Sequence, residues 1–540
     1  MSTTAAPTPA KLEPVFRESV LARLIAFFSG SVGLTVKILF LGALNALALW
    51  SVTVLADHSK WPAFAAVIAA TAGIDAVYML TRNRAVPAKF LIPGAVFLVG
   101  FQIAPIIYTI NVAFTNYSTG HILTKGQAIQ AIEQNSLQQP TNGAVYTLAY
   151  AHTAGGQLVE LLKDQTSGKT FVGTPKKLQP VPESDFTVKA GAIVAAKGYT
   201  LVPQKDLFSV VGFNVPTGKG AEAVQPQGFT QAAVLEPTLR YVPKRDEFVR
   251  ISNGTVFRDN KAGSFVSVNG QEELEPGWKT GVGVHNFGRV VHDPLISKPF
   301  LRVLAWTFAF AALTVFFSFA IGLLVAMALD KPGMRFLKTY RSLLVIPYAV
   351  PGFLSLLVWS GLLNDDFGVI NRSIVHPIFG TDVPWLFSDP WWARASCILV
   401  SVWLTVPYFF LVSLGALQAI PGELVEAARV DGGGPLQIFR RVRLPLLLVA
   451  VAPLLIASFA FNFNNFNNIY LLTGGGPASN DQSVAGSTDI LISYTWKIAF
   501  QAGKGNDYAL ASTIAILIFF IVATISAVSF WRTKALESLR

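Results

Sequence analysis

The stretch EAARVDGGGPLQIFRRVRLP, residues 426–445, is a polar segment that stands between two long apolar ones. Its opening Glu and Ala residues favour a short helix, and the glycines at 432–434 are suited to end that helix. Its second half is basic, with three arginines before Leu444 and Pro445. Because segments 395–419 and 444–473 are each long enough to cross a membrane, this stretch predicts a structured loop at a membrane surface.

The composition of the whole chain is typical of a protein that crosses a membrane many times. Of its 540 residues, 52% are hydrophobic and only 14% are charged, which is far from the balance of soluble enzymes. A spanning helix needs about 20 apolar residues. We therefore expect an all-α polytopic membrane protein with about eight spans, at residues 34–56, 62–80, 90–113, 299–329, 342–363, 395–419, 444–473 and 508–531.

The positions of Lys and Arg predict which loops face the cytoplasm, because cytoplasmic loops hold the positive excess. Basic residues precede span one, occupy every second loop and follow span eight: Lys11, Arg17, Arg23, Arg82, Arg84, Lys89, Lys331, Arg335, Lys338, Arg341, Arg429, Arg440, Arg441, Arg443, Arg532, Lys534 and Arg540. The opposite loops are acidic or mixed, as at Asp365, Asp366, Asp382 and Asp389. Both termini are expected in the cytoplasm, and the net charge of +11 requires no nucleic-acid partner.

Two further features bear on processing and redox state. An amphipathic stretch at residues 12–28 precedes a long first span, unlike a cleaved secretory leader, so we expect the N-terminus to be retained. Cys397 is the single cysteine. No intrachain disulfide is therefore possible, and we expect Cys397 to serve packing near the start of span six.

A polar, Gly- and Gln-rich region separates spans three and four, at residues 114–298. Runs such as 185–202 and 248–268 alternate in polarity and are punctuated by Gly and Asn, which favours short strands. We expect a mainly-β extracytoplasmic domain there that meets a soluble partner, although an inert insertion is the alternative. The predicted domains are the N-terminal segment with spans one to three (1–113), the inserted domain (114–298) and the helical core (299–540).

The sequence offers little support for catalysis or metal binding. Residues 167–170, SGKT, imitate the end of a phosphate-binding loop, but the pattern requires a glycine where Lys163 stands. The histidines form no metal-binding motif. Asp365 and Asp366 fit either a metal-dependent membrane glycosyl transferase or a solvated turn. Asp75 lies inside a span, where it either has a function or pairs with Arg82. The spans contain no series of charged residues, which disfavours ion-driven secondary transport.

The spacing within residues 426–445 carries a resemblance to a known family. Glu426, Ala427 and Ala428 are followed by Gly432, then by a β-branched residue at Val442 and by Leu444 and Pro445. This pattern resembles the cytoplasmic coupling loop of ATP-binding-cassette import permeases, although Val442 replaces the more frequent Ile. The resemblance implies that residues 421–445 dock on a separate ATPase. That partner would use ATP and Mg²⁺, and this chain would bind no cofactor and perform no hydrolysis.

Three other stretches narrow the resemblance: IPYAVPGFLSLL at 346–357, SFAFNFNNF at 458–466 and LLTGGGP at 471–477. Together with eight spans and a large domain after the third, they are similar to the permease subunits of maltose and maltodextrin importers. The resemblance implies a bacterial inner-membrane protein. Its expected partners are a second permease subunit, two copies of a cytoplasmic ATPase and an extracytoplasmic sugar-binding protein.

Five asparagines fall within the apolar seventh span, at positions 462, 464, 465, 467 and 468. At about 100° per residue, Ser458, Phe461, Asn462 and Asn465 share one helical stripe, while aromatic rings gather on another. Unpaired amides cost several kcal/mol in a membrane interior, so these amides need partners. They suit a neutral, hydroxyl-rich substrate, whereas interhelical hydrogen bonds of roughly 0.6 to 2 kcal/mol are the alternative. We assign the other three asparagines to packing or polar lining.

The resemblance also implies a set of sugar-facing residues: Tyr348, Leu404, Tyr408, Ser458, Phe461, Asn462 and Asn465. Gly352, Ser401 and Thr405 depart from the family pattern, in which these positions are serine, asparagine and glycine. The pocket would therefore differ in shape and hydrogen bonding. The sequence predicts a maltose or maltodextrin permease, with an importer of another sugar or a polyol as the alternative.

Overall fold

The computed structural model describes residues 31–79, 86–141, 143–210, 212–218, 222–331, 333–479, 483–501 and 505–537. The amphipathic stretch 12–28 and the topology residues Lys11, Arg17, Arg23, Arg82, Arg84 and Arg540 lie outside the described residues, and the side chains of Arg532 and Lys534 are also not described. Two compact units make up the chain, Met1–Tyr108 and Thr109–Arg540.

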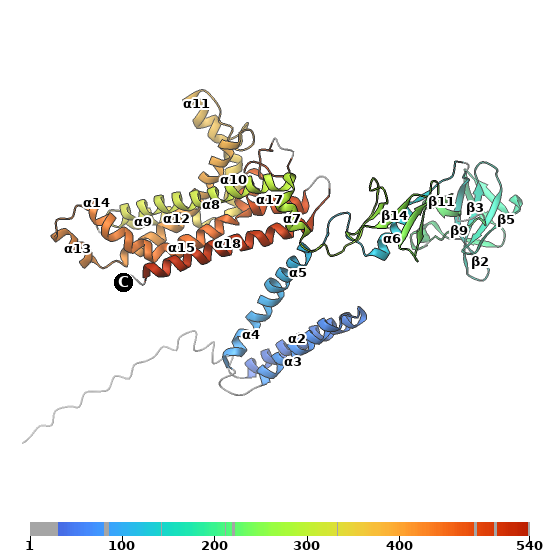
Figure 1. Cartoon of the computed structure of the whole chain (residues 1–540), viewed down its shortest axis with the longest axis horizontal. Helices are drawn as coiled ribbons and strands as arrows, with labels where there is room; N and C mark the ends of the chain where they lie inside the picture. Colours follow the sequence, from blue (N-terminus) through green and yellow to red (C-terminus); the bar gives the residue numbers. More distant parts are fainter. Residues whose placement is uncertain are drawn as a thin grey trace, which may run out of the picture. The chain divides into compact units, whose positions relative to one another are not determined.

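The first unit consists of long apolar helices. Helices α2 (Ser31–Asp57) and α3 (Trp61–Met79) form a hairpin (Figure 1). Helix α4 (Val86–Leu98) continues through a π-helical turn, Val99–Ile103, into α5 (Ala104–Ala113). Within the hairpin, Asn45 donates a hydrogen bond to the carboxylate of Asp75 over 3.1 Å. The intramembrane carboxylate therefore has an amide partner on the neighbouring helix, and the predicted pairing with Arg82 involves a residue outside the described part.

The region between spans three and four folds into antiparallel sheets, as expected. The larger sheet has the order β5-β4-β3-β2-β11-β10-β9, with β1 on β11 and the series β6-β7-β8 attached to β2. Its strands are β1 (Leu137–Gln138), β2 (Val145–Thr153), β3 (Leu158–Asp164), β4 (Thr170–Thr174), β5 (Lys177–Val181), β6 (Phe186–Lys189), β7 (Ala192–Ala196), β8 (Tyr199–Leu201), β9 (Val215–Pro216), β10 (Ala223–Pro226) and β11 (Gln231–Pro237). Because side chains alternate along a strand, Tyr146, Leu148 and Tyr150 of β2 fill one core, and Ala151 fills another on the opposite face.

A second sheet packs against a short helix. Its order is β12-β13-β14-β15-β16, and its strands are β12 (Leu239–Val242), β13 (Glu247–Arg250), β14 (Val256–Asp259), β15 (Phe265–Ser267) and β16 (Glu273–Leu274). Phe248, Phe257 and Phe265 are fully buried against Ile132 of α6 (Lys125–Asn135). The predicted strand runs 185–202 and 248–268 are thus confirmed as strands.

The two ends of the inserted region are fastened to the loop before the last span. Asn286 of α7 (His285–His292) donates hydrogen bonds to the carbonyls of Ala113 and Thr115, at 2.9 and 2.7 Å. Arg289 of the same helix pairs with Asp507 over 2.8 Å. Helix α8 begins directly afterwards at Pro294, before the predicted start at 299.

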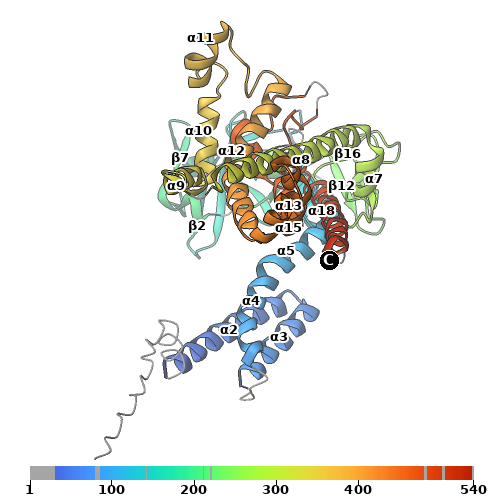
Figure 2. The ribbon, with the colours of Figure 1, turned by 90° about the vertical axis from the view of Figure 1, so that its left-hand side faces the viewer.

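Long helices form the core of the second unit and lie side by side in both views (Figures 1 and 2). The long members are α8 (Pro294–Leu329), α12 (Pro390–Gln418), α15 (Leu444–Phe463) and α18 (Tyr508–Glu537). The shorter ones are α9 (Leu337–Ala349), α10 (Gly352–Leu362), α11 (His376–Phe379), α13 (Gly422–Val430), α14 (Pro435–Ile438), α16 (Phe466–Thr473) and α17 (Leu491–Phe500). Cys397 is fully buried in this core, as the sequence predicted.

The count of spans agrees with the prediction, but the fifth span is not a straight helix. Among the described residues, seven helices are long and apolar enough to cross a membrane, and the pair α9–α10 brings the number to eight. The two members of that pair meet at 90°. Pro351 follows Val350 at the break, and a proline disfavours helical backbone at the preceding residue. The predicted continuous helix 342–363 was therefore wrong in its geometry.

The seventh span also differs from the predicted helix 444–473. A helix already starts at Pro435 and continues through a π-helical turn, Phe439–Arg443, so the basic half of the opening stretch is helical. Helix α15 then ends at Phe463, and α16 starts at Phe466 with Asn465 as its N-cap. Asparagine favours such caps because its side chain accepts from the exposed backbone N–H groups. The single helical stripe that was to include Asn465 was therefore wrong.

Candidate functional site

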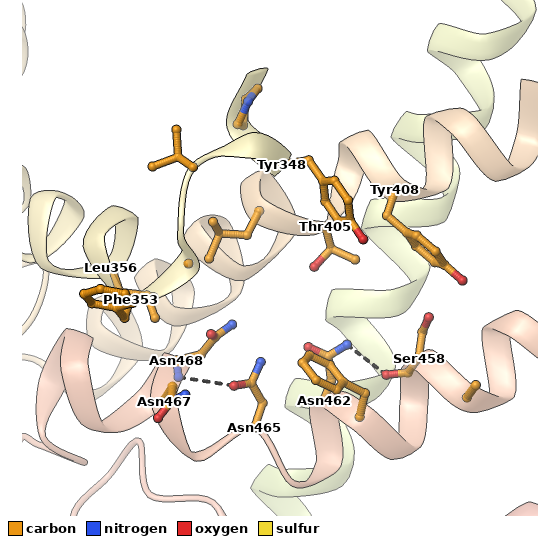
Figure 3. Close-up of a pocket in the computed structure, with 16 residues that line it drawn as sticks. Tyr348, Phe353, Leu356, Thr405, Tyr408, Ser458, Asn462, Asn465, Asn467 and Asn468 are labelled. Atoms are coloured by element: carbon orange, nitrogen blue, oxygen red, sulfur yellow. Dashed lines mark hydrogen bonds between the residues drawn. The ribbon is translucent and has the colours of Figure 1, made fainter. Parts of the chain in front are cut away.

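A cavity of about 770 Å³ opens where the bent pair α9–α10 faces α12, α15 and the start of α16 (Figure 3). Broken helices are tolerated at membrane depth where they line a cavity or are covered by protein, and both breaks, at Val350–Pro351 and at Asn464–Asn465, lie beside this space. The lining residues are Pro347, Tyr348, Val350, Gly352, Phe353, Leu356, Leu404, Thr405, Tyr408, Ala457, Ser458, Phe461, Asn462, Asn465, Asn467 and Asn468.

The structure brings all of the predicted sugar-facing residues to this one cavity. Tyr348 comes from α9, and Leu404 and Tyr408 come from α12. The others are Ser458, Phe461 and Asn462 of α15 and the N-cap residue Asn465. Four separate elements therefore supply residues that lie far apart in the sequence. Their role in binding a sugar stays a prediction.

The amides on α15 and α16 differ in how they are held. Asn462 is 2% exposed, and its Nδ2 donates to the Ser458 carbonyl over 2.9 Å. Its Oδ1 has no hydrogen-bond partner among the described residues. The Oδ1 of Asn465 accepts from the backbone N–H of Asn468 over 3.4 Å, which caps α16. Asn462 thus keeps a buried, unused acceptor next to the cavity.

Two asparagines that we assigned to packing or polar lining also border the cavity. Asn467 and Asn468 lie in the first turn of α16. Asn468 donates from Nδ2 to the Ser401 hydroxyl over 2.9 Å, so it joins lining and packing roles. The break in the helix brings them to the cavity. The Asn-rich pattern was a signal for both residues, but a continuous helix placed them elsewhere.

The three departures from the family pattern fall into two kinds. Gly352 and Thr405 line the cavity, and a Cβ at Gly352 would meet no atom within 4 Å. Ser401 is 1% exposed and does not line it. Its hydroxyl accepts from Asn468, and its carbonyl accepts from the Thr405 hydroxyl over 2.7 Å. Ser401 therefore acts on the cavity through its two neighbours.

The chemistry of the lining is neutral. Its polar groups are amides, hydroxyls and tyrosine phenols, and its apolar groups include the rings of Phe353 and Phe461. No carboxylate, ammonium or guanidinium group is among the lining residues. The volume lies within the usual range of small-molecule sites. Such a lining can bind a neutral ligand that has many hydroxyl groups and an apolar face.

The opening stretch of the sequence forms a second candidate site. Glu426 and Ala427 are exposed on α13, while Val425 is 7% exposed and holds the helix to the protein. The helix ends as predicted: Asp431 N–H donates to the Ala427 carbonyl over 3.0 Å, and Gly432 follows with φ +81°. Leu444 and Pro445 begin α15. An exposed short helix is thus fixed directly to the start of a membrane span.

The acidic pair Asp365 and Asp366 contributes to loop structure. The Asp365 carboxylate accepts from Leu386 N, Phe387 N and the Ser388 hydroxyl at 2.8 to 3.1 Å. Asp366 is exposed, as expected for a solvated turn. In the described part of the chain, no group of three His, Cys, Asp or Glu side chains is placed to hold a metal ion. These contacts give no support to a metal-dependent glycosyl transferase.

Comparison with known proteins gives matches over most of the chain. Residues 96–176 match the family "N-terminal of TM subunit in PBP-dependent ABC transporters". Residues 318–538 match the family "Binding-protein-dependent transport system inner membrane component". Among solved structures, a bacterial ABC transporter for import of the acidic polysaccharide alginate covers 47% of this chain and 84% of its own, at 20% identity and a TM-score of 0.41.

Curated relatives match over a longer range. The maltose/maltodextrin transport system permease protein MalF of Klebsiella aerogenes is 35% identical over 476 residues, which are 85% of this chain and 89% of that protein. The protein of the same name from Escherichia coli K12 is 35% identical over 482 residues, 87% of this chain and 91% of that one. The chain therefore belongs to the binding-protein-dependent transport system inner membrane components, as a multi-pass permease subunit of the MalF family.

Proposed function

We propose that this permease subunit moves maltose, maltodextrin or a closely related neutral oligosaccharide across the bacterial inner membrane through the cavity between α9–α10, α12, α15 and α16. The observation that carries the proposal is that residues from four elements meet around one neutral space. The relatives named as maltose/maltodextrin permeases support this substrate class. Like them, the chain is a transport component, not an enzyme.

In this proposal the lining divides its work between amides and rings. Asn462, Asn465 and Ser458 exchange hydrogen bonds with sugar hydroxyls, because they offer donors and acceptors without net charge. Tyr348, Tyr408 and Phe461 lie against the apolar faces of the sugar rings. Tyr348 and Phe461 are 58% and 68% exposed, so the cavity of the single chain is open on one side.

Partner chains complete the machine that we propose. A second, MalG-like permease subunit closes the open side of the cavity. A MalE-like sugar-binding protein delivers the sugar on the face of the inserted β domain. Two MalK-like ATPases bind at the cytoplasmic face, where both termini of this chain also lie. ATP and Mg²⁺ belong to those ATPases, and this chain binds no cofactor.

The exposed helix α13 is the proposed contact with the ATPase. Glu426 projects from it as an exposed carboxylate, which can pair with a cation in a groove of the partner. Because α13 leads through residues 435–443 into α15, a movement of the ATPase is transmitted to the helix that carries Ser458 and Asn462. The exposed Ala427, half-buried Ala428 and the turn at Gly432 keep this helix short and narrow.

The identity of the sugar is the finer question. Gly352 and Thr405 line the cavity in place of the serine and glycine of the family pattern. A hydroxyl is therefore lost at 352, and at 405 a side chain is added whose hydroxyl is bonded to the Ser401 carbonyl. A pocket with these changes favours either maltose in a shifted pose or a different oligosaccharide or polyol.

The proposal is tested by ATP hydrolysis of the reconstituted complex with its binding protein. The panel is maltose, maltodextrins, trehalose, sucrose and glycerol derivatives. Stimulation by maltose or maltodextrins supports the family substrate. Stimulation by another sugar alone supports the importer function but assigns it a different substrate. Lack of stimulation by every compound would contradict the sugar-importer proposal.

Coupling is tested separately with Glu426→Ala. The matched control is Glu423→Ala, because Glu423 is also exposed and lies one turn earlier on α13. We expect sugar-stimulated hydrolysis to fall about tenfold in the first variant, equivalent to about 1.4 kcal/mol of lost contact, and to persist in the control. Equal stimulation in both would rule out Glu426 as the coupling contact.

A further inference from the structure

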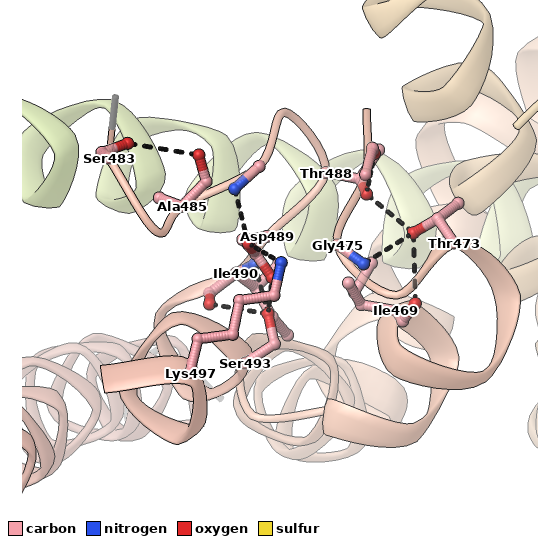
Figure 4. Close-up of polar contacts among 12 residues, drawn as sticks. Ile469, Thr473, Gly475, Ser483, Ala485, Thr488, Asp489, Ile490, Ser493 and Lys497 are labelled. Atoms are coloured by element: carbon pink, nitrogen blue, oxygen red, sulfur yellow. Dashed lines mark hydrogen bonds and ion pairs between the residues drawn. The ribbon is translucent and has the colours of Figure 1, made fainter. Parts of the chain in front are cut away.

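Two loop segments interlock at the far end of α16 from the cavity. Together with Lys497, residues 473–477 and 485–490 form what we call the loop clasp (Figure 4). The hydroxyls of Thr473 and Thr488 lie 2.7 Å apart, and Thr488 donates to the Gly476 carbonyl over 2.6 Å. Backbone bonds add to these, since Thr488 N–H donates to the Gly475 carbonyl. The loops before and after residues 480–482 are therefore held together.

A buried carboxylate lies at the centre of the clasp. Asp489 is 0% exposed and accepts from Gly486 N and Lys497 Nζ, both at 2.7 Å, and from the Ser493 hydroxyl at 2.8 Å. A buried charge is expensive unless it is paired and hydrogen-bonded. These three donors satisfy that requirement and join the loop to α17.

The glycine-rich motif LLTGGGP makes room for this ion pair. Gly475 has φ +82°, and a Cβ built on it would overlap the Asp489 carboxylate and lie 2.6 Å from Lys497 Nζ. The neighbouring Gly474 also has a positive φ, +61°, but a Cβ there would meet no atom within 4 Å. Of these two glycines, only Gly475 is required by a close contact as well as by its backbone conformation.

The clasp is fixed to helices that do not belong to it. Trp306 of α8 donates from Nε1 to the Thr488 carbonyl over 3.0 Å, and Leu491 N–H donates to the Thr307 hydroxyl over the same distance. Arg394 of α12 donates from Nε to the Ser487 carbonyl over 2.9 Å. The clasp therefore holds its position relative to α8 and α12, two long packed helices of the core.

Helix α16 connects the clasp to the cavity. It has eight residues and is therefore about 12 Å long at 1.5 Å per residue. Asn467 and Asn468 at its start line the cavity, and Thr473 at its end belongs to the clasp. A two-turn helix hydrogen-bonded at both ends moves as one body, so a shift of the clasp displaces the amides.

We propose that the Asp489–Lys497 pair positions the sugar site: it sets the place of α16 and thereby of the amides of Asn465, Asn467 and Asn468. Both are positioning residues that do not touch the sugar. The inference rests on the proposed sugar-binding role of the cavity. It assigns a purpose to the glycine-rich motif LLTGGGP.

The test is maltose binding to the purified complex of permease subunits and ATPase without the binding protein, measured by calorimetry. Lys497→Met removes the cation and keeps the aliphatic stem, whereas Lys497→Arg keeps the charge. We expect affinity to fall about tenfold with Met and to recover with Arg. Gly475→Ala, which pushes the pair apart, should match Met, while Gly474→Ala controls for backbone strain alone.

The outcomes separate the inference from the function on which it rests. If the wild-type complex binds no sugar of the panel, the proposed function fails. If it binds maltose and the Lys497→Met complex binds it equally well, the positioning role alone is overturned. Should Lys497→Met not assemble, Ser493→Ala removes one donor from Asp489, and an unchanged affinity in that variant overturns the positioning role as well.

Discussion

Polar side chains gather at both ends of α16, but they are used in opposite ways. In the loop clasp, Thr473, Thr488 and Asp489 all have partners within the chain. At the cavity, the buried Oδ1 of Asn462 has none among the described residues. Since a buried unpaired polar atom is costly, the difference teaches that the paired end keeps the shape, whereas the other, unpaired end leaves an acceptor unused next to the cavity.

The largest expected effect comes from breaking the paired end. Thr488→Val keeps the side-chain shape but leaves the Thr473 hydroxyl and the Gly476 carbonyl each short of a partner, so stability should fall by roughly 2–4 kcal/mol. The buried Cys397, the single thiol of the chain, should then react with a thiol-specific dye at lower temperature. In the control Thr495→Val the lost bond goes to its own helix, to Leu491. Equal midpoint temperatures of dye labelling in the two variants would contradict the stabilising role of the Thr488 hydroxyl.

The next largest effect is expected at Glu160, a buried group whose carboxylate is only partly paired although it does not lie at the cavity. Glu160 in β3 is 0% exposed, its Oε2 has no partner among the described residues, and it lines no described cavity. Burial raises its pKa from 4.5 to about 7. A raised carboxyl pKa means that folding favours the neutral form, so its stabilisation is complete below about pH 4.5 and is lost as the pH rises through 7. The difference between the two pKa values corresponds to roughly 3 kcal/mol in the free energy of unfolding.

Hydrogen exchange of the intact chain would measure this dependence locally. The Glu160 carboxylate accepts from Phe213 N–H over 3.0 Å, so that amide reports on the site. We expect its protection, corrected for intrinsic exchange, to decline between pH 5 and 7. Glu160→Gln should remove the decline, and a persistent decline would assign it to another group.

A smaller effect is expected at the unpaired end. Asn462→Ala should lower uptake about five- to thirtyfold, because roughly 1–2 kcal/mol of hydrogen bonding to the sugar is lost. Assembly with the partner chains should be unchanged. Asn464→Ala is the matched control, since Asn464 is exposed and does not line the cavity. Loss of assembly in the Asn462 variant would favour helix packing instead.

The smallest effect concerns preference among sugars. Gly352→Ser adds a hydroxyl to the cavity without a clash, and it should shift the ratio of ATPase stimulation between maltose and other sugars by a few-fold, about 1 kcal/mol or less. Gly361→Ser on the same helix also meets no atom and lies away from the cavity. A shift of equal size in both would remove Gly352 from the determinants of preference.

Much of the molecule was predictable from sequence because its patterns are local. The apolar lengths predicted the number of spans, and alternation with glycines predicted the strands. Helical periodicity failed at Asn465 because an amide that caps a new helix ends the old one. The 90° bend at Pro351 was missed because the length of an apolar segment does not show where its helix bends. The clasp was missed because Gly475, Asp489 and Lys497 meet only after the loop folds.

The neutrality of the cavity has a consequence for the energetics of the cell. Moving one elementary charge through a potential of 100 mV involves about 2.3 kcal/mol of electrical work. The lining residues contribute no such charge, and the proposed cargo has none. Moving the proposed cargo past this lining then performs no electrical work. Delivery should proceed at the same rate in an energised and in a depolarised cell, provided that ATP is supplied.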